Sequence, residues 1–149
     1  MAVVVDTGVL LAAADSDDAD HGRCAALLRS HRGELRVPAP VIPETSWQIE
    51  RSLGPRSEAA FLRLITVGDL QVIDLILVDW LRCIELIETY ADLGIGLVDA
   101  SMIAIAERLD IGTLATLNRR DFTVVRPTHR EAFELIPEVS PANVVESVR

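Results

Sequence analysis

The chain has 149 residues, half of them apolar, and its 23 acidic against 14 basic residues give a formal net charge of −9. A single domain is the default at this length, so we expect residues 1–139 to form one domain and residues 140–149 a C-terminal tail. The negative charge argues against a protein that binds nucleic acid through a broad basic face, and a nucleic-acid enzyme with this charge needs bound cations.

The first half of the chain alternates short apolar strands with helices. Residues 3–5, VVV, are apolar and β-branched on both faces, which is typical of a strand in the middle of a parallel sheet. Asp6 ends this strand, and the next residues, GVLLAAAD, predict a short helix. The further predictions are a polar break at 15–20, a helix at about 18–31, a strand in ELRVP, a helix over PVIPETSWQIERSLG, and a helix that follows PRS and runs to about Val67.

The second half continues the alternation. A strand is predicted in QVIDL, then an amphipathic helix over LVDWLRCIELIETYADLG, a helix over VDASMIAIAERLDIG, a strand in TLATL, a loop in NRRDF and a last strand in AFELI. In the amphipathic helix, Trp80, Ile84, Ile87 and Tyr90 recur at helical spacing and are expected to belong to the core. The alternation of strands and helices predicts an α/β fold with a mainly parallel sheet.

Composition also bears on location and on the cysteines. No segment reaches the ~18 uninterrupted apolar residues of a membrane span, and the N-terminus lacks the features of a secretory signal, so we expect a cytoplasmic protein without membrane contact. Cys24 and Cys83 form no CxxC pair and lie in helical apolar patterns, which predicts buried reduced thiols.

Two acidic positions lie where a parallel sheet binds ligands, beyond the carboxyl ends of its strands. Asp6 follows the first strand, and Asp121 lies in the loop after TLATL, so the two meet if these strands are neighbours. Asp6 is either a helix N-cap or a partly desolvated carboxylate that favours a cation beside it. Asp121 is either a surface residue paired with an arginine or part of a site that a phosphate backbone approaches.

Two further acids are predicted at helix starts. Glu44 follows Pro43 in a first turn, where an acid interacts favourably with the helix dipole, so a structural role is as well supported as a functional one. Asp99 heads its helix at the rim of the apolar face, as an N-cap or as a site residue. Trp47, three residues after Glu44, is expected to pack in the core rather than to stack on a base.

Several chemistries are excluded by the sequence. The Asp-Thr-Gly at 6–8 is the loop of aspartic proteases, but their chemistry needs two such loops in a β fold, and this chain has one, followed by helices. The acidic loop at 15–20 lacks the Gly and Glu of a calcium-binding EF-hand, and no nucleophile-elbow, Walker or GxGxxG motif occurs. Acids scattered over strand ends and helix starts suit Mg²⁺ or Mn²⁺, which take oxygen ligands.

The order and spacing of these motifs resemble the PIN domain, and in particular the VapC-type toxins of bacterial toxin–antitoxin pairs. The resemblance runs from residue 2 to about 136 through VVVDTGVLLAAAD, DHGRCAALL, VPAPVIPETSW, LVDASMIAIAERL and LATLNRRDF. It implies an α/β/α sandwich around a parallel sheet, endoribonuclease activity with Mg²⁺ or Mn²⁺, homodimerisation and inhibition by a small antitoxin, with higher assembly left open. A PIN fold without catalysis and a free-standing RNA-processing nuclease are the alternatives.

The resemblance also assigns residues. It implies that Asp6, Asp99 and Asp121 hold metal, and that Glu44 binds metal-bound water or acts as the general base for hydrolysis of an RNA phosphodiester. Further matches are polar positions that line the same pocket, Thr7 and Thr116. Relatives often carry Asp where this chain has Asn118, so either Asp121 or the Asn118 position completes the metal shell. Arg119 and Arg120 are expected to contact the RNA backbone or, equally, the antitoxin.

Overall fold

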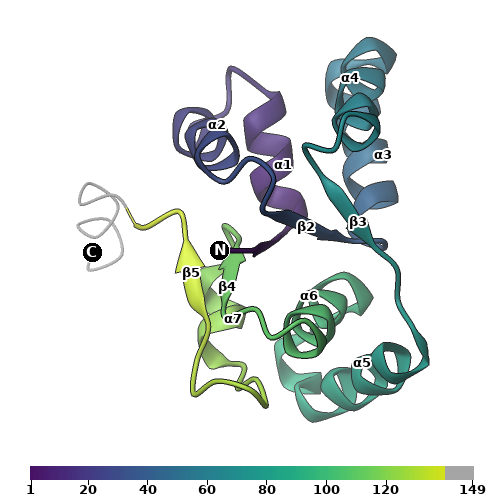
Figure 1. Cartoon of the computed structure of the whole chain (residues 1–149), viewed down its shortest axis with the longest axis vertical. Helices are drawn as coiled ribbons and strands as arrows, with labels where there is room; N and C mark the ends of the chain where they lie inside the picture. The colour runs from purple at the N-terminus through teal and green to yellow at the C-terminus, as the bar shows by residue number, and fades with distance from the viewer. Residues whose placement is uncertain (140–149) are drawn as a thin grey trace.

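A five-stranded sheet with helices on both faces organises the chain (Figure 1). The computed structural model describes residues 1–139, and the predicted tail at 140–149 lies outside them. The strands are β1 (Val3–Val5), β2 (Leu35–Pro38), β3 (Gln71–Ile73), β4 (Thr113–Ala115) and β5 (Glu134–Ile136). Their spatial order is β3-β2-β1-β4-β5, and every pairing is parallel. The predicted α/β fold with a parallel sheet is therefore confirmed.

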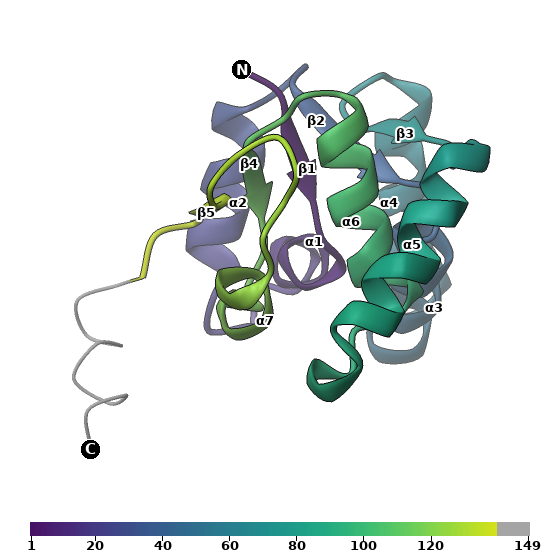
Figure 2. The same ribbon diagram turned by 90° about the horizontal axis from the view of Figure 1, so that it is seen from below.

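The helices cover the two faces of this sheet as separate layers. They are α1 (Thr7–Ala14), α2 (His21–Ser30), α3 (Val41–Leu53), α4 (Pro55–Thr66), α5 (Leu77–Thr89), α6 (Leu97–Arg108) and α7 (Arg119–Val124), with a 3₁₀ turn at Ala91–Leu93. Figures 1 and 2 show α1 to α4 on one side of the sheet and α5 and α6 on the other. Strand β1 is fully buried between these layers, as its all-apolar sequence predicts.

The strand order creates one switch point. The chain runs outward from β1 through β2 to β3 and then crosses to β4, on the other side of β1, before it adds β5. When the segments that follow two adjacent parallel strands turn to opposite sides, a crevice is left outside the carboxyl ends of those strands. Strands β1 and β4 are such neighbours, with Val5 opposite Ala115, so the segments after Val5 and Ala115 meet at this crevice.

Several element boundaries differ from the sequence predictions. Helix α2 begins at His21, α4 already begins at Pro55, and α6 ends at Arg108, four residues before Gly112. The segment predicted as a loop, NRRDF, is mostly the short helix α7, with Asn118 as its N-cap. The Asn118 side chain accepts from the backbone N–H of Asp121, a local bond that starts a helical turn where polarity alone suggests a loop.

Most of the apolar stripe of α5 faces solvent, so the prediction that it belongs to the core was wrong for Trp80, Ile84 and Ile87. Tyr90, directly after the helix, is half-buried and packs against the core. Trp80 is 47% and Ile84 55% exposed, and Ile87 lies at the exposed edge. The buried side of α5 carries Asp79, Cys83 and Leu86 instead.

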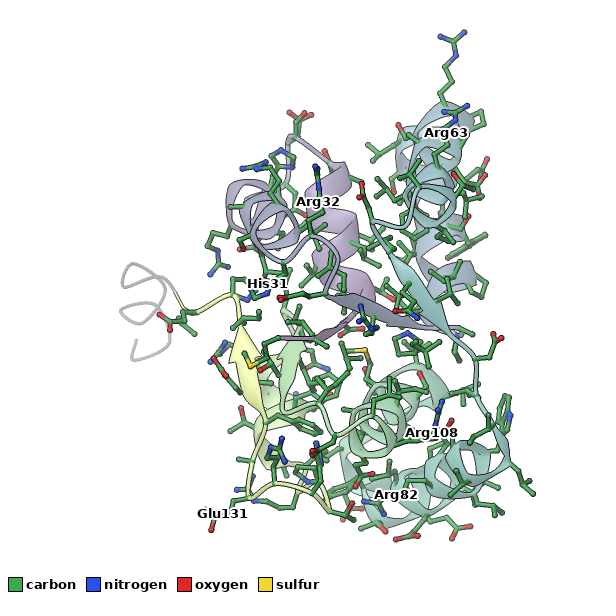
Figure 3. All side chains as sticks on the ribbon, viewed as in Figure 1. His31, Arg32, Arg63, Arg82, Arg108 and Glu131 are labelled. Atoms are coloured by element: carbon green, nitrogen blue, oxygen red, sulfur yellow. The ribbon has the colours of Figure 1, made fainter. Side chains whose placement is uncertain are left out.

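Two ion pairs explain why α5 is turned this way. Asp79, 1% exposed, pairs with Arg108 of α6 at 3.0 Å, and Arg82 pairs with Glu107 at 2.8 Å. Figure 3 shows Arg82 and Arg108 beside these two helices. Once buried, the Asp79 carboxylate requires its partner, so it determines which side of α5 meets α6.

Two composition-based predictions can be compared with the described residues. Cys24 and Cys83 are buried free thiols, as expected, and burial raises the pKa of each to about 11. Among the helices within residues 1–139, none is both long and apolar enough to cross a membrane.

Candidate functional site

Asp6 lies at the switch point, as the N-cap of α1. The backbone N–H of Thr7 donates to its Oδ1 at 2.8 Å, and the Thr116 hydroxyl donates to its Oδ2 at 2.9 Å. The carboxylate is 8% exposed. Burial raises the pKa of Asp6, the two hydrogen bonds oppose this, and nearby Glu44 adds to the rise. The N-cap and site interpretations of Asp6 are therefore compatible, because one carboxylate oxygen accepts from the start of α1 and the other from Thr116, in the segment after β4.

Thr116 connects Asp6 to the segment that follows β4. Its fully buried hydroxyl donates to Asp6 and accepts from the backbone N–H of Asn118 at 3.0 Å. The Asn118 side-chain amide in turn donates to Oδ2 of Asp121 at 3.0 Å. Asn118 therefore holds Asp121 in place, so these two candidates for the same role are hydrogen-bonded partners here.

Glu44 approaches from α3, which lies beside α1 in the same helix layer (Figures 1 and 2). It lies in the first turn of α3, and the Thr7 hydroxyl donates to its Oε2 at 2.8 Å. Thr7 thus bridges two carboxylates, through its backbone N–H to Asp6 and through its side chain to Glu44. The helix start after β2 supplies Glu44 because β2 is the other neighbour of β1.

Asp99 comes from the opposite side of the sheet. It lies in the first turn of α6, whose N-cap is Gly96, so Asp99 is not itself the cap. Burial, followed by the charges of Asp6, Asp121 and Glu44, raises the pKa of Asp99 to about 6. The four predicted acids are therefore close enough to repel one another, although they come from four separate helices.

All four carboxylates lie at helix N-termini, where backbone N–H groups favour negative charge. None of the four forms an ion pair with Arg, His or the N-terminus within residues 1–139. Their support from the described protein therefore comes from the helix N-termini together with hydrogen bonds from Thr7, Thr116 and Asn118. Partly buried acids in this arrangement favour a bound cation.

The donor set fits Mg²⁺ or Mn²⁺, since its oxygens come from carboxylates, hydroxyls and an amide. Within residues 1–139, however, no three Asp, Glu, His or Cys side chains converge closely enough to hold one ion between them. This spacing suits an ion that keeps several waters and takes one or two carboxylates directly, which is the usual mode of Mg²⁺. A cage of three protein ligands would require the side chains to move.

The two candidate arginines differ in their surroundings. The Arg119 guanidinium donates to the backbone carbonyls of Leu135 and Pro137, at 3.2 and 3.1 Å, and so fastens α7 to the end of β5. Arg120 is exposed and makes no ion pair with a described residue. Arg120 is therefore the freer of the two to contact a ligand.

Trp47 is the residue near this site that the sequence interpretation missed. It was expected in the core but is 57% exposed, one turn beyond Glu44 on α3. The buried positions Val41, Thr45 and Ile49 define the inner side of α3, and Trp47 is out of phase with them. The sequence signal that could have shown this is the spacing of the buried positions along α3, which Trp47 does not share.

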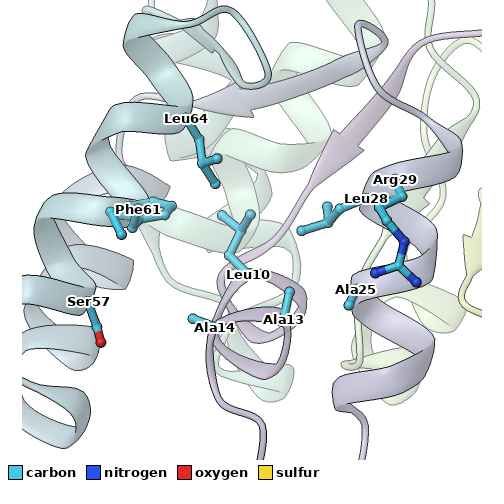
Figure 4. Close-up of a pocket in the computed structure, with 10 residues that line it drawn as sticks. Leu10, Ala13, Ala14, Ala25, Leu28, Arg29, Ser57, Phe61 and Leu64 are labelled. Atoms are coloured by element: carbon cyan, nitrogen blue, oxygen red, sulfur yellow. The ribbon is translucent and has the colours of Figure 1, made fainter.

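A mostly apolar groove lies away from the carboxylates. It measures about 360 Å³ between α1, α2 and α4 (Figure 4), and its floor is formed by Leu10, Ala13, Leu28, Phe61 and Leu64. Its lining includes none of the four acids. This surface therefore suits an apolar partner rather than the chemistry at the sheet edge.

Comparisons with known proteins agree with this fold. The sequence matches the PIN domain family over residues 3–126. It is 28% identical to ribonuclease VapC26 of Mycobacterium tuberculosis over 135 residues, which span 91% of this chain and all of the relative.

Solved structures give the same result for the fold. The structure resembles VapC20 of M. tuberculosis, a toxin that cleaves the sarcin–ricin loop, with a TM-score of 0.70, 21% identity, and coverage of 76% of this chain and 87% of that one. It also resembles VapBC2 of Rickettsia felis bound to a promoter DNA fragment, with a TM-score of 0.66, 19% identity, and coverage of 93% and 100%. At these identities, the likeness concerns the fold.

Proposed function

Because the chain belongs to the PIN domain family, we propose that it is an endoribonuclease dependent on Mg²⁺ or Mn²⁺ and the toxin of a VapBC-type toxin–antitoxin pair. The observation that carries this proposal is the meeting of Asp6, Glu44, Asp99 and Asp121 at the switch point of the sheet. The 28% identity to a ribonuclease over its full length supports RNA as the substrate.

In the proposed reaction, Asp6, Asp99 and Asp121 would hold the ion at the RNA phosphate, directly or through its bound waters. A bound divalent ion supplies Lewis-acid polarisation of the phosphate and lowers the pKa of water. Glu44 takes the proton from the attacking water, since Thr7 occupies only its Oε2 and leaves Oε1 available. Thr116 and Asn118 keep Asp6 and Asp121 oriented. The products are expected to carry 5′-phosphate and 3′-hydroxyl ends.

RNA cleavage by the purified protein tests the proposal. Cellular RNA incubated with Mg²⁺ or Mn²⁺ should be cut, and both EDTA and Asp6→Asn should abolish the cutting. Asp17→Asn is the matched control, because Asp17 is exposed and far from these residues in the fold, in the loop after α1. An Asp6→Asn protein that cuts as fast as the wild type would refute the metal-site assignment.

The proposed partners are an antitoxin and a second copy of the chain. The apolar groove between α1, α2 and α4 offers an antitoxin a concave surface away from the acids. The R. felis relative is a toxin–antitoxin complex, which supports such a partner. The homodimer is supported by the exposed apolar face of α5, which comprises Ile76, Leu77, Val78, Trp80, Leu81, Ile84 and Ile87. Growth arrest on expression, relieved by a small protein encoded beside the gene, would separate a toxin from a processing nuclease.

A further inference from the structure

Trp47 is an exposed aromatic residue on α3, the helix that carries Glu44. It lies three positions after Glu44 on α3, and a rise of 1.5 Å per residue places it only about 4.5 Å further along the helix axis. Residues three apart on a helix are surface neighbours. The indole has 57% of its surface exposed and lies less than one helical turn from Glu44 along α3.

Arg51 lies on the same side of α3, one turn beyond Trp47. Its guanidinium carbon is 5.2 Å from the centroid of the indole ring, in cation–π contact. Arg51 is exposed and forms no ion pair with any residue in the range 1–139. The pair therefore combines a flat aromatic ring with a positive charge that no described carboxylate neutralises, beside a strongly acidic site.

The surroundings of Trp47 distinguish it from a protein-docking patch. Trp47 is the only large apolar side chain exposed on α3, and its exposed or half-buried neighbours on the helix are Ser46, Gln48, Glu50 and Arg51. The α5 face, in contrast, is a continuous apolar surface. An isolated indole among polar groups suits a ligand that has a flat ring and a charged backbone, which describes a nucleotide.

We propose that Trp47 and Arg51 form a nucleotide subsite, in which Trp47 stacks on a base of single-stranded RNA next to the cleaved phosphodiester and Arg51 contacts a backbone phosphate. The inference rests on the proposed ribonuclease function. Stacking is tolerant of base identity because every base has a π-face. The subsite would therefore contribute affinity and position the strand, with little base selection of its own.

Fluorescence provides a direct binding test, since the chain has only two tryptophans, Trp47 and Trp80. In an Asp6→Asn background, Trp80→Phe leaves Trp47 as the single reporter. Titration with an unstructured oligoribonucleotide should quench its emission. The matched control, Trp47→Phe with Trp80 retained, should show little change.

Three outcomes of this titration would overturn the proposal. One is that Trp47 emission does not respond to RNA. Another is equal quenching by an abasic ribose-phosphate oligomer, which would show that no base is stacked. The last is a Trp47 signal that shifts with protein concentration alone and is then insensitive to RNA, which would mean that a second copy covers the indole.

Kinetics supply an independent readout. Trp47→Ala should raise KM for single-stranded RNA roughly 5- to 150-fold with kcat nearly unchanged, the range that loss of one stacked base implies. Trp47→Phe should restore most of the affinity, because Phe retains an aromatic face. A wild type that cleaves RNA alongside an Ala variant with unchanged KM overturns the subsite alone. If the wild type does not cleave RNA, the proposed function fails, and the fluorescence titration still decides whether Trp47 binds a base.

Discussion

Replacing Asp99 by Asn is expected to stabilise the metal-free protein at neutral pH, although it removes a site residue. Burial and three neighbouring carboxylates raise the pKa of Asp99 to about 6. An unfolded chain has an Asp pKa of about 3.9, and one pKa unit corresponds to 1.36 kcal/mol, so the full penalty is about 3 kcal/mol. Asp99 is partly exposed, and solvent screening reduces this to about 1.5 kcal/mol.

Asp99→Asn also loses a favourable interaction with the α6 dipole, which lowers this stabilisation by about 0.5 kcal/mol. The free energy of unfolding should therefore increase by about 1 kcal/mol. For a chain of this size, that gain raises Tm by about 2–4 °C. The pH window follows from the two pKa values. Between about pH 4 and 6 the folded state retains the Asp99 proton that the unfolded state has lost, so wild-type stability falls as pH rises through this range.

Thermal unfolding in EDTA measures this effect. At pH 7.5, Asp99→Asn should melt above the wild type, and at pH 4.5 most of the difference should disappear. Asp17→Asn, an exposed replacement of the same chemistry, should change Tm little at either pH. Excess Mg²⁺ or Mn²⁺ should stabilise the wild type more than the variant and so reduce the gap. The reasoning is refuted if Asp99→Asn melts below the wild type in EDTA, or if its Tm exceeds that of the wild type by the same amount at both pH values. Repulsion among the acids would then not be what destabilises the metal-free site.

Three further predictions concern other parts of the fold. Thr116→Val removes the hydroxyl that donates to Asp6, so the pKa of Asp6 should rise further. The rate of RNA cleavage should then fall about 10-fold or more at pH 6 and by less at pH 8, and an unchanged pH profile would contradict this. Arg108→Leu leaves the buried Asp79 carboxylate unpaired and should cost about 3–5 kcal/mol in chemical unfolding, whereas Arg63→Leu, an exposed control, should cost under about 0.5 kcal/mol. Ile84→Asp should convert a dimer to a monomer in sedimentation analysis without lowering Tm of the monomer. If the wild type is already monomeric, the α5 face is not a dimer interface.

Hydrophobic periodicity was a good guide to the fold for a local reason. A strand buried on both faces has to be apolar throughout, as Val3–Val5 is. A helix packed on a sheet has to carry an apolar face toward the sheet and a polar face toward solvent. The positions of the acids after strands or at helix starts were also readable, because helix N-termini accept carboxylates whether or not they serve a site. For that reason, sequence alone left each of the four with two interpretations.

Periodicity was misleading where a polar contact decided the orientation of a helix. The apolar stripe of α5 has the spacing of a core face, yet the Asp79–Arg108 and Arg82–Glu107 pairs turn it outward. Trp47 likewise has the size and apolarity of a core residue but lies out of phase with the buried positions of α3. The α5 error concerns partners distant in the chain, which no window of sequence contains, whereas the Trp47 error could have been avoided from the spacing within α3 itself.

The class of the fold, the approximate element order and the residue types available for chemistry could be read from the chain, because they depend on local apolar pattern and on the preference of acids for helix starts. Three features emerged only from the packing of the elements in space: the pairing of β1 with β4, the approach of Asp99 from the other layer, and a hydrogen-bonded path from Glu44 to Asp121 through Thr7, Asp6, Thr116 and Asn118. The reason is physical: a raised carboxyl pKa and an exposed indole arise from what surrounds a side chain in space, and those surroundings come from segments separated by up to about a hundred residues of chain.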